Sequence, residues 1–201
     1  MKCRGAQAKQ GFENAPAFLL PRATRIIIAS FCAFRIHTFV HALMTEPLSR
    51  AIGALLRQQH KTLALAESCT GGLIASLLTD VPGSSEYFLG SVVAYAYEAK
   101  ERLLDVPHEL LLQHGAVSEA VTRVLALNAR AKFGADVAIG ITGIMGPGGA
   151  TPTKPLGLTY IALSAPDASW CRRFVWNGDR LQNKADSAHA ALEMLHEYLT
   201  R

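Results

Sequence analysis

Short apolar runs alternate with segments of helical periodicity along most of this 201-residue chain. TLALA (62–66), FLGSVVAYA (88–96) and DVAIGIT (136–142) are the short apolar runs, and each predicts a buried strand. Strands separated by helices predict a layered α/β domain. GLTYIAL (157–163) and WCRRFVW (170–176) are joined only by the turn-like SAPDAS, so we expect these two to form an antiparallel pair.

Helix boundaries are marked by capping and breaking residues. Residues 98–113 predict two short helices divided at Pro107, because proline interrupts a helix. A longer helix is expected to begin after Ser118 and to stop at Gly134. Asp179 is expected to cap the closing helix.

The first 43 residues differ from the rest in charge. They hold six of the 20 basic residues and one of the 16 acidic residues, which leaves 14 basic and 15 acidic residues afterwards. We interpret residues 1–43 as an N-terminal extension outside the fold, with Met44 as the natural start, although an arginine-rich targeting segment is an alternative. One domain over 44–201 is expected.

The distribution of charged and apolar residues argues against several classes of binding partner. The near-neutral body argues against a nucleic-acid partner, because a phosphate-backbone footprint needs clustered basic residues. The longest uncharged run of the extension is too short to span a bilayer, so no membrane partner is expected. The four cysteines form no CxxC pair, which favours a reduced cytoplasmic compartment and no metal site.

AESCTGG (66–72) is the first candidate site. An apolar strand ends there on Ser68 and Thr70, and Gly71 and Gly72 then open a helix. Free N–H groups at such a helix start can stabilise an anion or a developing oxyanion, and glycine lets the backbone approach a ligand. An ordinary capped helix is the alternative interpretation of this stretch alone.

Lys100 is the second candidate, in the YAYEAK stretch where a strand meets a helix. A lysine acts as a general base only if burial or nearby positive charge lowers its pKa. The alternative is a solvated lysine early in an amphipathic helix.

A glycine-rich loop and an arginine form the third candidate. The loop follows the DVAIGIT strand from Thr142 onward and contains Gly146, Gly148 and Gly149, whose N–H groups can form a phosphate-holding nest. Arg180 opens the last helix, where the helix dipole gives a cation no advantage, so an anionic partner outside the helix is favoured. A surface loop and a solvated arginine are the alternatives.

Taken together, these stretches resemble the C-terminal domain of the CinA family (competence/damage-inducible protein), which includes nicotinamide mononucleotide deamidases. The resemblance runs in one order from about 60 to 195: AESCTGG, LTDVPGSS, Tyr95 with EAK, HGAVSE, TGIMGPGG with KPLG, and GDR. It implies a three-layer α/β/α sandwich with a mostly parallel, mixed sheet of about five strands. It also implies hydrolysis of nicotinamide mononucleotide to nicotinate mononucleotide and ammonia, in pyridine nucleotide salvage.

The resemblance also implies roles for single residues. Ser68 would be the nucleophile, Lys100 its base, and Tyr95 and Thr142 active-site partners, with no metal and no cofactor. The substrate-binding set would be Thr70, Gly71, Gly72, Gly146, Gly148, Gly149 and Arg180. A pyridine mononucleotide is the expected partner, together with a second copy of the chain in a homo-oligomer, taken as a dimer.

Four positions depart from the family pattern. The family commonly has Asn at Tyr97, Gly at Asp105, Thr at Leu158 and Arg at Lys184. Lysine lacks the bidentate fork of arginine, so phosphate affinity is the property most exposed to change. A catalytically silent nucleotide-binding module is therefore the alternative function, and a third hypothesis is an adaptor for DNA-uptake or repair proteins.

Overall fold

A computed structural model of the chain describes residues 47–201. The proposed extension over 1–43 and the proposed start at Met44 lie outside the described residues. After a helix over 47–58, the elements are β1 (Leu63–Glu67), α2 (Leu73–Thr79), a 3₁₀ turn (Ser84–Glu86), β2 (Phe88–Val93), α3 (Tyr97–Leu104), α4 (His108–His114), α5 (Glu119–Phe133), β3 (Val137–Gly143), β4 (Leu158–Ser164), β5 (Ser169–Val175) and α6 (Arg180–Leu199).

The five strands form one sheet in the order β2-β1-β3-β4-β5. β1 is parallel to both of its neighbours, β2 and β3, whereas β4 is antiparallel to both β3 and β5. The sheet is therefore mixed, as expected, with as many antiparallel as parallel pairs. The carboxyl ends of β1, β2 and β3 lie together at one edge, which is where open α/β sheets bind ligands.

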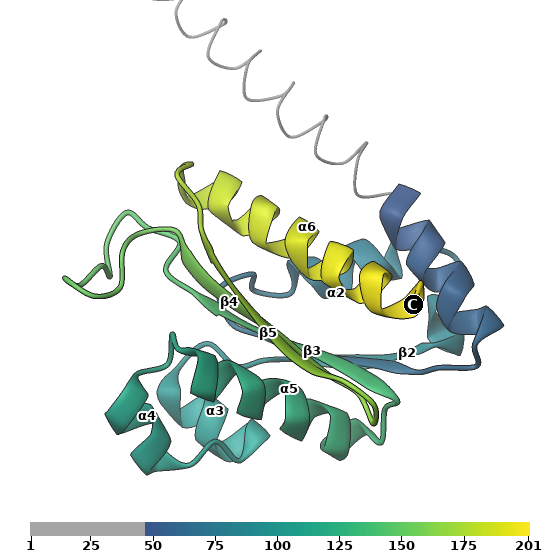
Figure 1. Cartoon of the computed structure of the whole chain (residues 1–201), viewed down its shortest axis with the longest axis horizontal. Helices are drawn as coiled ribbons and strands as arrows, with labels where there is room; N and C mark the ends of the chain where they lie inside the picture. The colour runs from purple at the N-terminus through teal and green to yellow at the C-terminus, as the bar shows by residue number, and fades with distance from the viewer. Residues whose placement is uncertain (1–46) are drawn as a thin grey trace, which may run out of the picture. The chain divides into compact units, whose positions relative to one another are not determined.

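Helices cover both faces of this sheet (Figure 1). The first helix, α2 and α6 pack on one face over residues such as Leu65, Ile139 and Ile161. α3, α4 and α5 pack on the other face, where Ala66 and Ala138 are among the buried contacts. The three-layer α/β/α expectation is confirmed.

Most predicted boundaries agree with the structure to within a few residues. Pro107 separates α3 from α4, and Ser118 caps α5 by accepting a hydrogen bond from the N–H of Val121 at 3.4 Å. Asp179 caps α6 in the same way, with the N–H of Gln182 as donor at 2.9 Å. Local capping chemistry depends on neighbours in sequence, so a sequence pattern can predict it.

The packing of α5 on β3 depends on a glycine. A Cβ atom on Gly140 would lie 2.7 Å from both the carbonyl oxygen of Thr122 and the amide nitrogen of Ala126. Because glycine has no side chain, the backbone of α5 lies directly against the strand. Within residues 47–201, every helix is too short or too polar to span a lipid bilayer.

Candidate active site

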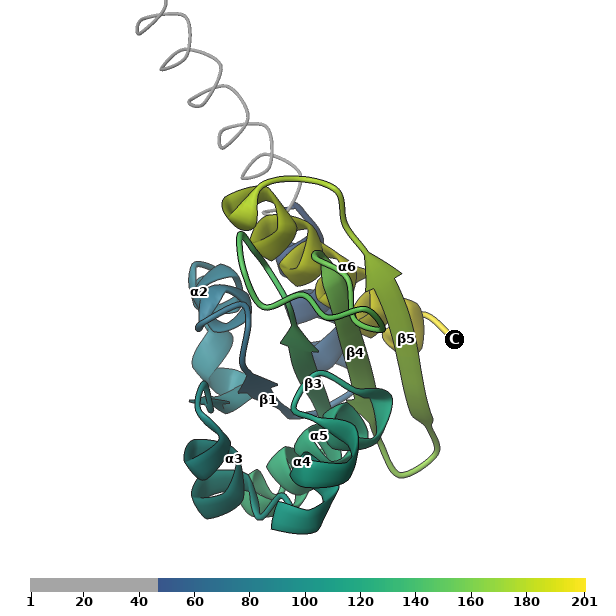
Figure 2. The same cartoon turned by 90° about the vertical axis from the view of Figure 1, so that its left-hand side faces the viewer.

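The strand register brings together the candidate segments that follow β1, β2 and β3. Glu67 pairs with Val93 of β2 on one side and with Ile141 of β3 on the other. Continuing this parallel register by one residue places Ser68 beside Ala94 and Thr142. Ser68 is therefore in the middle of three parallel carboxyl ends, and α2 and α3 lie on opposite sides of its strand (Figure 2).

Lys100 lies against Ser68. The lysine side chain is 1% exposed, and its Nζ is 3.1 Å from Ser68 Oγ, 2.7 Å from the carbonyl oxygen of Ala94 and 3.0 Å from that of Tyr95. Burial lowers the pKa of Lys100 from 10.5 to about 8, because removing an ammonium from water disfavours its charged form. With this pKa, about a tenth of the lysine is neutral at pH 7 and about half at pH 8.

The two carbonyl groups orient this amine. A neutral amine has two N–H bonds and one lone pair, and carbonyl oxygens can only accept hydrogen bonds. The carbonyls of Ala94 and Tyr95 therefore take both N–H groups of neutral Lys100. The lone pair then faces Ser68 Oγ, which is the geometry needed to remove the hydroxyl proton.

Glu67 holds the turn that presents Ser68. Its carboxylate is 1% exposed and accepts five hydrogen bonds. The donors are the hydroxyls of Thr70 (2.8 Å) and Ser91 (3.2 Å) and the N–H groups of Gly72 (3.0 Å), Ile74 (3.2 Å) and Ala75 (3.0 Å). A carboxylate here also complements the positive end of the α2 dipole. The sequence around Glu67 does not indicate this role, because its hydrogen-bond partners are up to 24 residues away.

The amides of the glycine turn are mostly occupied. We expected N–H groups near Gly71 to be available to a ligand, but Gly71 donates to the Ser68 carbonyl at 3.1 Å and Gly72 donates to Glu67. Within residues 47–201, the N–H groups of Cys69 and Thr70 have no backbone oxygen as acceptor, and both interact with the Cys69 sulfur. Sulfur is a weak acceptor, so a substrate oxygen beside Ser68 could take its place.

Two other side chains of the turn, Thr70 and Cys69, are poorly suited to act as the nucleophile. Thr70 is fully buried and its hydroxyl is committed to Glu67. Burial raises the pKa of the Cys69 thiol to about 12, so the thiolate needed for nucleophilic attack is scarce at neutral pH. The serine is therefore the better nucleophile in this turn.

Thr142 contacts α5. Its side chain is 1% exposed, and its Oγ1 is 2.8 Å from the Oγ1 of Thr122, a residue to which sequence analysis assigned no role. Thr122 also donates its hydroxyl to the Ser118 carbonyl at 2.6 Å. Thr142 and Ser68 thus share the sheet face that α3 and α5 cover.

Arg180 connects three distant segments. It donates from Nη1 to the Gly146 carbonyl at 2.7 Å and from Nη2 to the Tyr95 hydroxyl at 2.9 Å. One turn later on α6, Lys184 points toward the glycine turn, since its Nζ is 3.8 Å from the position a Cβ on Gly71 would take. Within residues 47–201 this lysine has no ion-pair partner. Lys184 therefore borders the Ser68 turn, whereas Arg180 lies between Tyr95 and the glycine-rich loop.

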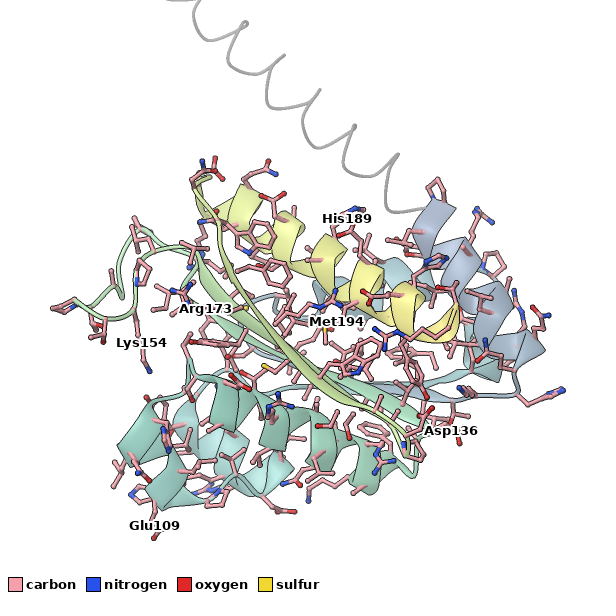
Figure 3. All side chains as sticks on the ribbon, in the orientation of Figure 1. Glu109, Asp136, Lys154, Arg173, His189 and Met194 are labelled. Carbon is pink, nitrogen blue, oxygen red and sulfur yellow. The ribbon has the colours of Figure 1, made fainter. Side chains whose placement is uncertain are left out.

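The glycine-rich loop between β3 and β4 is anchored at both ends. Gly146 is buried near Arg180, whereas Gly148 and Gly149 are exposed. Lys154 points back toward the α4 layer (Figure 3), where its Nζ donates to the carbonyl of His114. The loop therefore bridges the two helical layers at the edge that carries Ser68.

Three of the departures from the family pattern have structural surroundings of their own. Asp105 ends α3 in the left-handed conformation, with φ 47°, which is the backbone region that favours glycine, and its carboxylate pairs with Lys132 at 2.6 Å. The Tyr97 hydroxyl accepts the N–H of Ala116 at 3.1 Å. Leu158 is buried at the start of β4.

No cluster of three or more His, Cys, Asp or Glu side chains suited to a metal ion occurs within residues 47–201. The site brings together a serine, a partly neutral lysine, two amides without a backbone oxygen acceptor, and two cations. Such a set suits nucleophilic acyl transfer on a substrate that carries an anionic group.

Comparisons with known proteins agree on one family. Residues 45–199 match the family described as CinA C-terminal domain. Curated relatives include the CinA-like proteins of Desulfotalea psychrophila, 47% identical over 77% of this chain and 37% of that protein, and Chlorobium chlorochromatii, 49% identical over 79% and 38%. The chain thus spans about two fifths of the length of such relatives.

Solved structures give the same result. A competence/damage-inducible protein from Agrobacterium tumefaciens is 34% identical with a TM-score of 0.75, over 78% of this chain and 96% of that one. A competence damage-inducible protein from Klebsiella pneumoniae is 32% identical with a TM-score of 0.76, over 78% and 98%. The chain belongs to the CinA C-terminal domain family.

Proposed function

We propose that this protein is an amidohydrolase that converts nicotinamide mononucleotide to nicotinate mononucleotide and ammonia in the cytoplasm. The observation that carries the reaction type is the buried contact between Lys100 Nζ and Ser68 Oγ, with both N–H groups of the neutral amine directed to carbonyls. The nucleotide itself is proposed from the family resemblance and from the cations at the site.

The proposed reaction has two halves. Neutral Lys100 takes the hydroxyl proton while Ser68 Oγ attacks the carboxamide carbon, and the negative charge on the carboxamide oxygen is stabilised by the N–H groups of Cys69 and Thr70. The lysine proton passes to the departing nitrogen, which leaves as ammonia. Water then hydrolyses the acyl-serine, with Lys100 again as base, and the acid is released.

The phosphate is proposed to bind at the start of α6. Lys184 faces the turn between β1 and α2, and Arg180, one turn earlier on α6, contacts the Gly146 carbonyl and the Tyr95 hydroxyl. An anionic group bound here would bring the pyridine ring within reach of Ser68. Lys184 supplies charge without the planar fork of arginine, so Arg180 would make the bidentate contact.

Ammonia release from nicotinamide mononucleotide tests this proposal directly. The full chain should release ammonia in proportion to nicotinate mononucleotide, and Ser68→Ala should reduce the rate by about a thousandfold or more. Ser76→Ala, an exposed serine on α2, is the matched control and should keep the wild-type rate. Hydrolysis by Ser68→Ala at the wild-type rate would refute the serine mechanism. Binding without ammonia release would favour the silent nucleotide-binding module.

A further inference from the structure

The buried hydroxyl pair of Thr142 and Thr122 has a defined proton direction. The Thr122 hydroxyl has a single proton, and that proton is donated to the Ser118 carbonyl, which can only accept. Thr122 therefore cannot donate to Thr142. The short contact of 2.8 Å between the two hydroxyls requires Thr142 to be the donor and Thr122 the acceptor. Thr142 thus has only oxygen lone pairs left for any group that binds beside it.

We propose that Thr122 is a positioning residue that fixes Thr142 as a hydrogen-bond acceptor, so that the site selects a carboxamide over the corresponding carboxylate. The proposal rests on the proposed function, because it concerns the group that reacts at Ser68. The strand register places Thr142 next to Ser68, where the carboxamide carbon must lie. The amide nitrogen would donate one N–H to Thr142.

Substrate and product differ in their ability to donate a hydrogen bond to Thr142. The carboxamide nitrogen donates hydrogen bonds, whereas the carboxylate of the product only accepts them. An acceptor fixed beside a carboxylate leaves both oxygens without a donor, and the partial negative charge of the hydroxyl oxygen repels the carboxylate, which weakens binding. The Thr142 oxygen therefore favours binding of the carboxamide substrate and assists release of the carboxylate product.

The surroundings make the direction difficult to reverse. Thr122 is fully buried, so water cannot readily take its place as the acceptor of the Thr142 proton. The glycine at position 140 lets the backbone of α5 contact β3, which brings the Thr122 side chain within hydrogen-bond distance of the strand. If the Thr142 hydroxyl rotated so that its proton pointed away from Thr122, that proton would lose the Thr122 oxygen as its acceptor.

A purely structural role for Thr122 predicts a different outcome. Helical threonines often donate to the carbonyl four residues earlier, and Thr79 does so in α2 with Ala75 at 2.9 Å. Loss of such a bond alone would weaken the fold, or reduce both ligand affinities together. Loss of the directed pair should instead change amide and acid binding in opposite directions.

The test compares the two ligands in a background that does not turn over. Full-length Ser68→Ala protein, with and without Thr122→Val, is titrated calorimetrically with nicotinamide mononucleotide and with nicotinate mononucleotide. Valine removes the acceptor and frees the Thr142 proton. We expect weaker amide binding and tighter acid binding, so that the ratio of the two affinities falls by about tenfold. Thr122→Ser should retain the wild-type ratio, and so should the matched control Thr79→Val.

An unchanged ratio in Thr122→Val, or an equal loss for both ligands, would overturn the proposal. If Thr122→Val does not fold, Thr122→Ala is measured instead, because it removes the same hydroxyl without a branched side chain. If the Ser68→Ala background binds neither ligand, the same ratio follows from kcat/KM and product inhibition in active enzyme. Failure of the wild type to release ammonia marks failure of the proposed function, which is distinct from an unchanged ratio in an active enzyme.

Discussion

The proposed role of Lys100 as a general base depends on its burial in the core. The side chain is 1% exposed, and its amine is held by two backbone carbonyls and the Ser68 hydroxyl. Burial lowers its pKa to about 8 because the charged form loses its hydration. A base of this kind is active only in the neutral form.

We therefore predict that ammonia release rises with pH and levels off above about 8. Below this pKa the lysine is mostly protonated, so the rate should fall about tenfold per pH unit as the pH decreases. A profile of kcat/KM between pH 6 and 10 measures this. A rate that is flat from pH 6 to 8 would show that Lys100 is not the base.

Glu67 provides a second prediction about a single residue. Its buried carboxylate accepts five hydrogen bonds, and the NH₂ group of glutamine cannot accept any of them. Glu67→Gln should lower the free energy of unfolding by about 2 to 3 kcal/mol and reduce turnover, because the Ser68 turn loses its support.

Denaturant unfolding of Glu67→Gln measures that loss. Glu109→Gln is a suitable control, because Glu109 is an exposed carboxylate in the first turn of α4 and should change stability by less than about 0.5 kcal/mol. Equal effects in the two variants would contradict the role assigned to Glu67.

At the level of elements, the contact between α5 and β3 sets how close Thr122 lies to Thr142. A methyl group on Gly140 would lie 2.7 Å from backbone atoms of α5, and backbone cannot rotate away as a side chain can. The helix must shift, and Thr122 would shift with it away from Thr142.

Gly140→Ala should therefore destabilise the protein by about 1 to 3 kcal/mol and lower turnover further than stability alone explains. Thermal unfolding measures the loss of stability, and ammonia release measured well below the unfolding temperature measures the loss of turnover separately. Gly148→Ala is the control for stability, since nothing lies within 4 Å of its added Cβ. A Gly140→Ala protein as stable as that control would contradict the close-packing explanation.

At the level of the whole molecule, the proposed anion site assembles residues from opposite ends of the domain. Arg180 reaches Tyr95 and Gly146, which are 85 and 34 residues away in sequence. Lys184 approaches the turn at Gly71 from the same helix. The site therefore exists only when α6 packs over the carboxyl edge of the sheet.

Arg180→Ala and Lys184→Ala should each lower kcat/KM for nicotinamide mononucleotide by about tenfold or more, because each removes a cation from the proposed phosphate site. The nucleoside without the phosphate is the control substrate, and its kcat/KM should change much less. An equal loss of kcat/KM for both substrates would show that these cations support the fold and do not bind the phosphate.

The segments that follow all three parallel strands carry candidate residues that the sequence alone indicates. The pairing of Ser68 with Lys100 is what the family resemblance implies, and the structure places the two polar atoms in contact. The three layers and the capping residues Ser118 and Asp179 were also predicted correctly. These features follow from local patterns of apolar spacing, turns and caps, or from motifs long enough to be specific.

Which segments form helices and strands, and which residue types could react, follow from the sequence. Three contacts follow only from the packing of the elements: Glu67 occupies amides of the glycine turn, the hydroxyls of Thr122 and Thr142 meet, and Lys184 borders Gly71. The partners in the last two contacts are far apart in the sequence. Hydrogen-bond partners, burial and the lowered pKa of Lys100 depend on groups that only the packed sheet and helices bring together, and no local pattern encodes that distance.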